Sequence, residues 1–192
     1  MRSILVRSAA KPRQQRVLLK LNTAAAAVGL AVDVIDIDWQ QLSLTQFDVL
    51  LVVENLDCFY QLHAFILQLP YTQPLIIYRG DKLYSKGCKA LKAAWLKQNK
   101  PTLYFGDFDA KGVSIALNEG YSAMLLPDFA TLQQHASTAM LPDKQLSFIA
   151  NIKAKTVTSE FQPYQQLLCQ QLKGLRQQNM QDLRLAVMNL TA

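Results

Sequence analysis

The chain has 192 residues, of which 51% are hydrophobic and 18% charged, and it carries a formal net charge of +6 at pH 7. This composition excludes wholesale disorder, and the length suffices for one domain that buries its own core. The three cysteines are scattered without a CxxC spacing, so neither a disulfide framework nor a zinc site is indicated. No apolar run is long enough to cross a bilayer, and we expect a cytoplasmic protein that does not bind membranes.

The positive charge is concentrated in two stretches. Six basic residues precede the first acidic residue, Asp33, and eight more lie between residues 79 and 111. Such clustering is typical of a protein with an acidic partner such as nucleic acid, although a merely basic protein has the same net charge.

Residues 1–46 are predicted to form an N-terminal basic extension of one helix and one strand. Apolar residues and alanines at helical spacing predict a helix over residues 14–28, ended by Gly29. An alternation of apolar and acidic residues then predicts a strand over residues 32–37.

Strands and helices alternate through residues 47–128, which is typical of a parallel sheet with helices on both faces. The sequence predicts strands over residues 48–53, 74–78, 102–105 and 122–126. It predicts helices over residues 56–69, 85–98 and 111–117. We therefore expect an α/β fold whose parallel sheet has about four strands, with functional loops at the carboxyl ends of those strands.

Residues 129–192 are predicted to form a helical extension that packs on or beside this core. Short helical pieces reach to about residue 152, and a longer helix follows over residues 162–190 with an interruption at Gly174. Its glutamine-rich face leaves two possibilities open, namely packing back onto the sheet or an oligomer contact such as a homodimer.

Three carboxylates are expected to meet at one edge of the sheet. Glu54 ends the most apolar strand, where a carboxylate is costly unless something compensates it. Asp107 and Asp109 end the third strand, and their spacing of two points both side chains the same way. Carboxylate oxygens, completed by water and phosphate, are the ligands that Mg²⁺ prefers, and Mn²⁺ is an alternative. The competing interpretation is that Asp109 only caps the helix that follows.

A row of lysines supports a phosphate-bearing partner. The helix that begins near residue 82 has lysines on one side and apolar residues on the other, and no acidic residue lies between them. These lysines are Lys82, Lys86, Lys89, Lys92, Lys97 and Lys100. The alternative is a solvated face that keeps the protein soluble. Arg79 and Lys111 flank the predicted metal site on two other loops, where cations can position a phosphodiester.

Other chemistries have little support in this sequence. It has only two histidines and lacks the GxxxxGK[ST], GxGxxG and HExxH motifs. The aromatic residues fall mostly on predicted core faces, so the sequence predicts no surface on which bases stack.

The residues at these strand ends resemble the Toprim domain of topoisomerases, primases and related nucleases. The resemblance rests on Glu54-Asn55 after one strand and on the run Gly106 to Gly112, GDFDAKG, after another. Together with the YRGD of residues 78–81, they resemble the branch containing the topoisomerase VI A subunit, its meiotic double-strand-break relatives and the nuclease subunit JetD of Wadjet plasmid-defence systems. The three motifs occur in order within residues 48–127.

This resemblance implies Mg²⁺-dependent DNA cleavage, by hydrolysis or transesterification, as part of a larger assembly. It implies that Glu54 is a general acid or base or a metal ligand, and that Asp107 and Asp109 are metal ligands. Asp81 is either an auxiliary ligand or a cap. DNA contacts are expected from Arg79, Lys82, Lys86, Lys89 and Lys111. The implied partners are DNA and an ATPase subunit, condensin-like in plasmid defence or GHKL-type in a topoisomerase-like assembly.

Two departures from the family pattern keep alternatives open. Ala110 stands where these families often have proline, and the residues ahead of Asp48 are too few for the winged-helix domain that relatives carry there. The attacking group can therefore be water or a tyrosine from another domain. A catalytically incomplete DNA-binding Toprim module and a phosphoacceptor-like α/β domain are the alternative functions.

Overall fold

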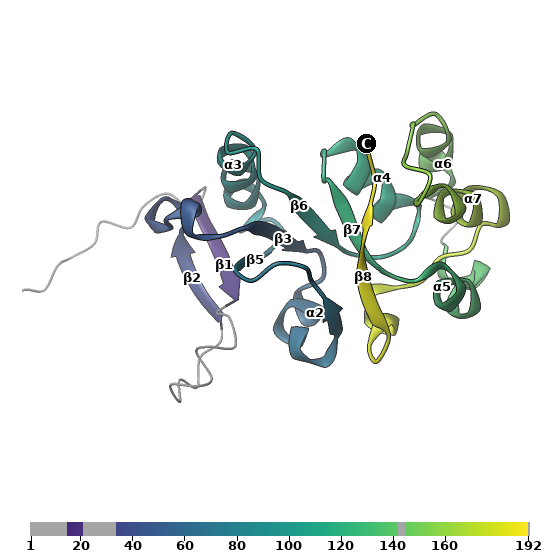
Figure 1. Ribbon diagram of the computed structural model, residues 1–192, viewed down its shortest axis with the longest axis horizontal. Coiled ribbons are helices and arrows are strands. Elements are labelled where there is room, and N and C mark those ends of the chain that lie inside the picture. The colour runs from purple at the N-terminus through teal and green to yellow at the C-terminus, as the bar shows by residue number, and fades with distance from the viewer. Residues whose placement is uncertain (1–14, 21–33, 142–144, 192) are drawn as a thin grey trace, which may run out of the picture.

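A single mixed sheet forms the centre of the computed structural model, which describes residues 15–20, 34–141 and 145–191 (Figure 1). Within these residues the strands are β1 Arg16–Lys20, β2 Val34–Asp38, β3 Val49–Val53, β4 Ile66–Gln68, β5 Pro74–Tyr78, β6 Thr102–Phe105, β7 Ala123–Pro127 and β8 Arg184–Asn189. Their order across the eight-stranded sheet is β2-β1-β5-β3-β6-β7-β8-β4. The fold class is therefore α/β, as the alternation of strands and helices predicts.

The four strands in the middle of the sheet, β5, β3, β6 and β7, are parallel. They match the four predicted strands. Every residue of β3 is buried, because the strand has neighbours on both edges and covered faces on both sides. Val53 is in register with Tyr78 of β5 and with Phe105 of β6, so the carboxyl ends of these three strands lie together.

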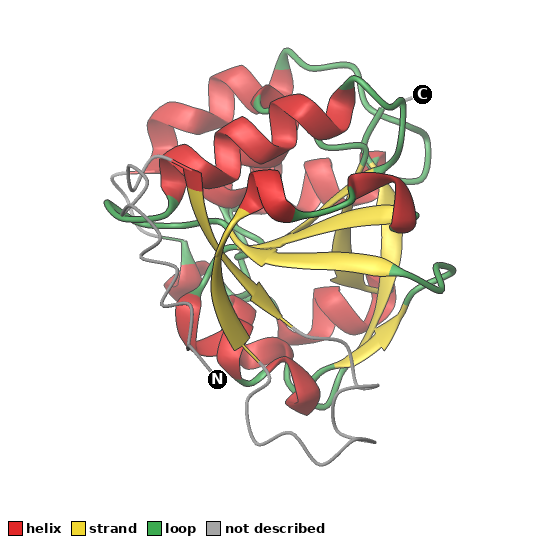
Figure 2. Ribbon diagram, turned by 90° about the vertical axis from the view of Figure 1, so that its left-hand side faces the viewer, coloured by secondary structure: helices red, strands yellow, loops and turns green. Residues whose placement is uncertain are grey.

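Helices lie on both sides of the curled sheet (Figure 2). The α-helices in the described residues are α2 Leu56–Tyr60, α3 Ser85–Leu96, α4 Ala110–Asn118, α5 Phe129–His135, α6 Leu146–Lys153 and α7 Gln162–Gln171. Short 3-10 turns span Trp39–Gln41, Leu44–Gln46, Leu62–Ala64, Thr138–Met140 and Gln177–Met180. None of the described helices combines the length and the apolar character that a bilayer crossing requires.

The predicted N-terminal helix is wrong where the structure describes it. Residues 16–20 form β1, which pairs antiparallel with both β2 and β5, while residues 21–28 of the predicted helix lie outside the described residues. Val17, Leu18 and Leu19 are all buried. A helix would bury only one side of this run, whereas a strand inside a covered sheet buries all of it.

The predicted C-terminal helical extension is wrong beyond Gln171. Leu172 adopts a left-handed backbone with φ of 54° and ends α7. The chain then returns as β8, which pairs antiparallel with β7 and parallel with β4. β4 itself occupies residues predicted as the end of a helix. The sheet is therefore mixed and twice as wide as the predicted parallel sheet of about four strands, and all three predicted segments contribute strands to it.

Candidate functional site

Glu54 lies where the end of β3 meets the end of β6. Its backbone N–H donates to the carbonyl of Phe105 at 2.8 Å, which continues the pairing of the two strands by one residue. Its Oε2 is buried, and the neighbouring Tyr104 hydroxyl is a neutral group that interacts with the Glu54 carboxylate. One neutral hydroxyl does not compensate the charge of a buried carboxylate, so Glu54 suits a positively charged ligand.

The glycine after β6 makes room for this carboxylate. A Cβ atom at Gly106 would lie 2.4 Å from Glu54 Oε2 and 2.7 Å from the Tyr104 ring. Real Cβ atoms do not approach other atoms so closely, so Glu54 can lie over the β6 loop only because residue 106 has no side chain.

Asp107 faces the same space from the end of β6. Its Oδ1 accepts a hydrogen bond from the backbone N–H of Gln177 at 2.7 Å. Burial raises the pKa of Asp107, and the negative charges of Asp109 and Glu54 raise it further, against the opposing effects of the Gln177 N–H and the Arg176 guanidinium. A bound cation would relieve this accumulation of negative charge.

Glu54 and Asp107 line one cavity of about 370 Å³, together with Asp57, Tyr78 and Gln177. The structure therefore brings together two of the three predicted carboxylates. Two carboxylates with water and phosphate in the remaining positions suffice for Mg²⁺, so the pair fits a hard divalent cation.

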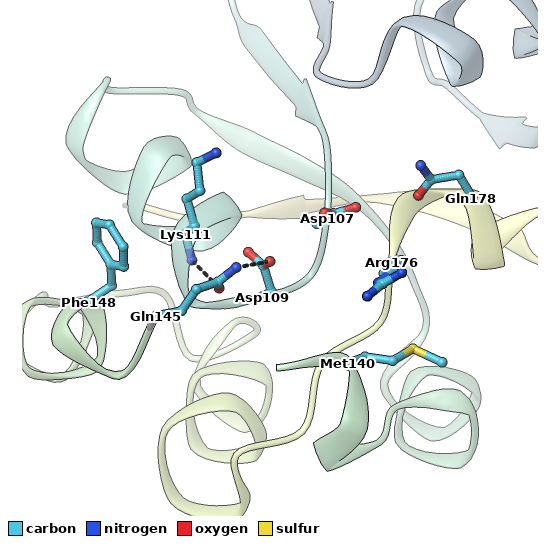
Figure 3. A pocket seen from close by; sticks show the side chains of 8 residues that line it. All are labelled: Asp107, Asp109, Lys111, Met140, Gln145, Phe148, Arg176 and Gln178. Atoms are coloured by element: carbon cyan, nitrogen blue, oxygen red, sulfur yellow. Dashed lines mark hydrogen bonds between the residues drawn. The ribbon is translucent and has the colours of Figure 1, made fainter. Parts of the chain in front are cut away.

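Asp109 has a different environment. It is 7% exposed and caps α4, because its Oδ1 accepts from the Gly112 N–H at 2.7 Å. Its Oδ2 accepts from Gln145 Nε2, also at 2.7 Å (Figure 3). Both oxygens are thus occupied, as the capping interpretation predicts. Among the residues that the structure describes, no three or more His, Cys, Asp or Glu side chains are grouped so as to hold a metal ion.

A second cavity, of about 500 Å³, is also lined by Asp107 (Figure 3). It is lined by Asp107, Asp109, Lys111, Met140, Gln145, Phe148, Arg176 and Gln178. The predicted auxiliary ligand Asp81 lines neither cavity. It is exposed, and its Oδ1 accepts from the Leu83 N–H at 2.7 Å in the turn ahead of α3, whose N-cap is Tyr84.

The predicted basic helix face is not uniform. Lys92 is buried, donates to the Glu119 carbonyl at 2.7 Å and lies 3.8 Å from the centroid of the Tyr121 ring. Lys100 donates to the carbonyl of Phe47 at 2.6 Å. Both lysines therefore hold the fold together. The exposed lysines of this face are Lys82, Lys86, Lys89 and Lys97.

The two loop cations also differ from each other. Arg79 is three-quarters buried and forms an ion pair of 2.6 Å with Glu119. Lys111, at the start of α4, is exposed and lines the second cavity beside Asp109. Of these two predicted DNA contacts, only Lys111 presents its side chain to a cavity of the site.

Sequence reasoning missed two glutamines that organise the site. Gln177 is fully buried, accepts from the Asn55 N–H at 3.1 Å and donates to the Phe105 carbonyl at 3.2 Å. Gln145 bridges Asp109 and the backbone N–H of Lys111. Gln177 falls within the predicted C-terminal helix, whose glutamines are predicted to share one face. No local signal distinguishes Gln177 from the other glutamines of that face.

The comparisons with known proteins identify a family without naming an activity. A search of curated proteins found no match to this chain. The model of a family described as a domain of unknown function, DUF7281, matches residues 10–188. Because this match covers most of the chain, the protein belongs to the DUF7281 family.

Proposed function

We propose that this protein is a Toprim-like, Mg²⁺-dependent enzyme that cleaves DNA, and that Glu54 and Asp107 hold the cation. The observation that carries the proposal is that Glu54 and Asp107 line one cavity, while the partly buried Glu54 carboxylate forms no ion pair among the described residues. Two carboxylates that share a cavity without a cation are unfavourable in a merely structural role. It suits a site that a divalent cation completes.

The arrangement of the strands supports the same function. The Glu54-Asn55 and Gly106-Asp107 motifs follow β3 and β6, which are neighbouring parallel strands near the middle of the sheet. Ligand sites of α/β sheets are built at such carboxyl ends. The proposed Toprim-like unit is therefore the block β5-β3-β6-β7, to which the other strands of the mixed sheet are added.

Each residue of the site has a proposed role. A bound Mg²⁺ would neutralise charge on the scissile phosphate and on the leaving oxygen. Glu54 and Asp107 bind the cation, and Gln177 holds Asp107 in place through its backbone N–H. Asp109 joins the ligands only if it releases Gln145. DNA is bound by the exposed lysines at the start of α3 and by Lys111.

The test uses Glu54→Gln and Asp107→Asn, with Glu160→Gln as the matched control because Glu160 is an exposed glutamate ahead of α7. Mn²⁺ binding is measured by electron paramagnetic resonance, and cleavage by nicking of a supercoiled plasmid in Mg²⁺ or Mn²⁺. We expect each site variant to lower Mn²⁺ affinity at least tenfold, about 1.4 kcal/mol, and to abolish nicking. The control should behave as the parent. Unchanged metal binding and nicking in both site variants would refute the proposal.

The full hydrogen bonding of Asp109 favours a second candidate function. With one of three carboxylates engaged by Gly112 and Gln145, the chain can be a DNA-binding Toprim module that is catalytically incomplete without a partner domain or an ATPase subunit. This candidate predicts Mn²⁺ binding that depends on Glu54 and Asp107, DNA binding that weakens steeply with salt, and no nicking by the isolated chain.

A further inference from the structure

The second cavity has the chemistry of a nucleotide site. Its volume of about 500 Å³ lies within the usual range for small-molecule sites, and it adjoins the proposed cation site because Asp107 lines both cavities. Its lining combines two cations, Lys111 and Arg176, with an aromatic ring, Phe148. A nucleotide is the ligand that offers both anionic oxygens and a flat ring.

The two cations can each contact an anion. Lys111 and Arg176 are both exposed, and neither is held in an ion pair within the residues that the structure describes, although Arg176 acts electrostatically on Asp107. The two carboxylates of the lining, Asp107 and Asp109, both accept hydrogen bonds from other groups. By contrast, the partly buried Arg79 is occupied by Glu119.

Phe148 has the most exposed side chain among the phenylalanines of this chain. All eight phenylalanines lie in the described residues, and Phe148 is 37% exposed. Its ring stands on α6 at one side of the cavity, while Arg176 lies at the opposite side and Lys111 stands between them (Figure 3). Proteins that bind single-stranded nucleic acids combine aromatic rings, on which the bases stack, with cations that contact the phosphates.

We propose that this cavity holds an unpaired nucleotide of the DNA substrate, with its base against Phe148 and its phosphates at Lys111 and Arg176. The proposal rests on the proposed function and names its substrate class as DNA with a single-stranded segment. A base inside a duplex presents its edge in the grooves and keeps its faces stacked on its neighbours. Only an unpaired base can offer a face to Phe148.

The binding experiment measures fluorescence anisotropy of a labelled oligothymidine and of a labelled duplex of the same length, both in EDTA. Phe148→Ala should weaken binding of the single strand about tenfold, since loss of one stacked base costs about 1–3 kcal/mol and tenfold is about 1.4. Duplex binding should change less than twofold. Phe148→Tyr should retain the parent's affinity because it keeps a ring. Leu146→Ala, at an exposed apolar residue of the same helix, is the matched control and should change neither affinity.

Two further arms define the ligand. Thymidine monophosphate should compete with the oligonucleotide in the parent and less well in Phe148→Ala, which would show that one nucleotide fills the cavity. Arg176→Gln and Lys111→Gln should each lower the slope of log affinity against log salt by about one. Phe148→Ala that binds the single strand as the parent does, or that weakens both DNAs equally, would overturn the proposal.

This outcome is separable from that of the proposed function. Binding in EDTA does not require the cation pair, and Glu54→Gln leaves Phe148, Lys111 and Arg176 in place. Loss of single-strand preference in Phe148→Ala together with no nicking by any variant would support the nucleotide site and refute only the enzyme. Nicking that depends on Glu54, with no effect of Phe148→Ala on single-strand binding, would refute only the nucleotide site.

Discussion

At the scale of single residues, the site depends on a contact between a glycine and two side chains of neighbouring strands. Glu54 Oε2 and the Tyr104 ring both lie against the backbone of Gly106. The Tyr104 hydroxyl is itself buried and interacts with the Glu54 carboxylate. Burial, followed by the charge and the hydrogen bonding of Glu54, raises the pKa of Tyr104 well above its ordinary value, so this hydroxyl stays protonated at neutral pH.

Gly106→Ala should therefore damage the site more than the fold. The added methyl would force Glu54 away from its present position, because the buried Tyr104 ring cannot move as easily as the end of a glutamate. We expect at least a tenfold loss of Mn²⁺ affinity and about 1–3 kcal/mol of lost stability, the usual cost of overpacking. Calorimetric titration and urea unfolding measure the two effects.

Gly120→Ala is the control for this substitution. Gly120 has φ of 70° and nothing within 4 Å of an added Cβ, so alanine there strains the backbone without touching the site. We expect a stability loss of about 1 kcal/mol with unchanged Mn²⁺ affinity. Equal metal affinity in Gly106→Ala and Gly120→Ala would contradict the placement of Glu54.

At the scale of elements, a charged cluster ties β5, α3 and α4 together. Glu119, which ends α4, pairs with Arg79 after β5 at 2.6 Å and with Lys92 of α3 at 3.4 Å. These ion pairs outweigh burial at Glu119 and lower its pKa from 4.5, whereas burial outweighs them at Lys92 and lowers the pKa of the lysine. The cluster fixes α3 and α4, and α4 begins beside the candidate site, where Lys111 lines the second cavity.

Glu119→Gln should destabilise the protein by about 2 kcal/mol at neutral pH, because two partly buried cations lose their partner. The lowered pKa of Glu119 means that its ionised form stabilises the folded state above pH 4.5, and that this contribution is lost as the pH falls through the folded-state pKa. The difference between parent and variant in urea unfolding should therefore shrink in acid. A difference that stays constant as the pH falls from neutral to below the folded-state pKa of Glu119 would contradict this account.

At the scale of the whole molecule, the C-terminal region completes the site from the far end of the sequence. The segment between α7 and β8 places Gln177 against Asn55, Phe105 and Asp107, which follow or end β3 and β6. β8 then pairs with β7 and anchors this segment to the sheet. The candidate site therefore forms only when regions more than a hundred residues apart have come together.

Gln177→Ala should uncouple these regions. It leaves the Asn55 N–H without a partner, whereas the Phe105 carbonyl loses one hydrogen bond but still accepts from the Glu54 N–H. An unsatisfied buried N–H costs about 1–3 kcal/mol, so we expect a stability loss of that size in urea unfolding and weaker Mn²⁺ binding through displacement of Asp107. Gln178→Ala, at the exposed neighbour, should leave both quantities unchanged. Similar losses in the two variants would contradict the bridging role.

The sequence by itself determined the centre of this protein. A short, continuous apolar run is buried whichever strands it pairs with. Local composition therefore suffices to predict β3, β5, β6 and β7. The order of parallel strands then places Glu54 and Asp107 at one edge, and the structure has both in one cavity. The sequence also predicted the helix cap at Asp109, as the alternative to a metal ligand. An aspartate directly before a helix accepts hydrogen bonds from the first N–H groups of that helix.

Only the tertiary structure decided the rest, because pairing partners far apart in sequence leave no local signal. Residues 16–20 and 184–189 form strands because they pair with neighbouring strands of the sheet, although their apolar residues have helical spacing. Burial of Lys92 and exposure of Phe148 depend likewise on which elements pack around them. The spacing of apolar residues along a segment shows which residues share a face. Long-range packing determines whether that face meets the core, a partner side chain or a cavity.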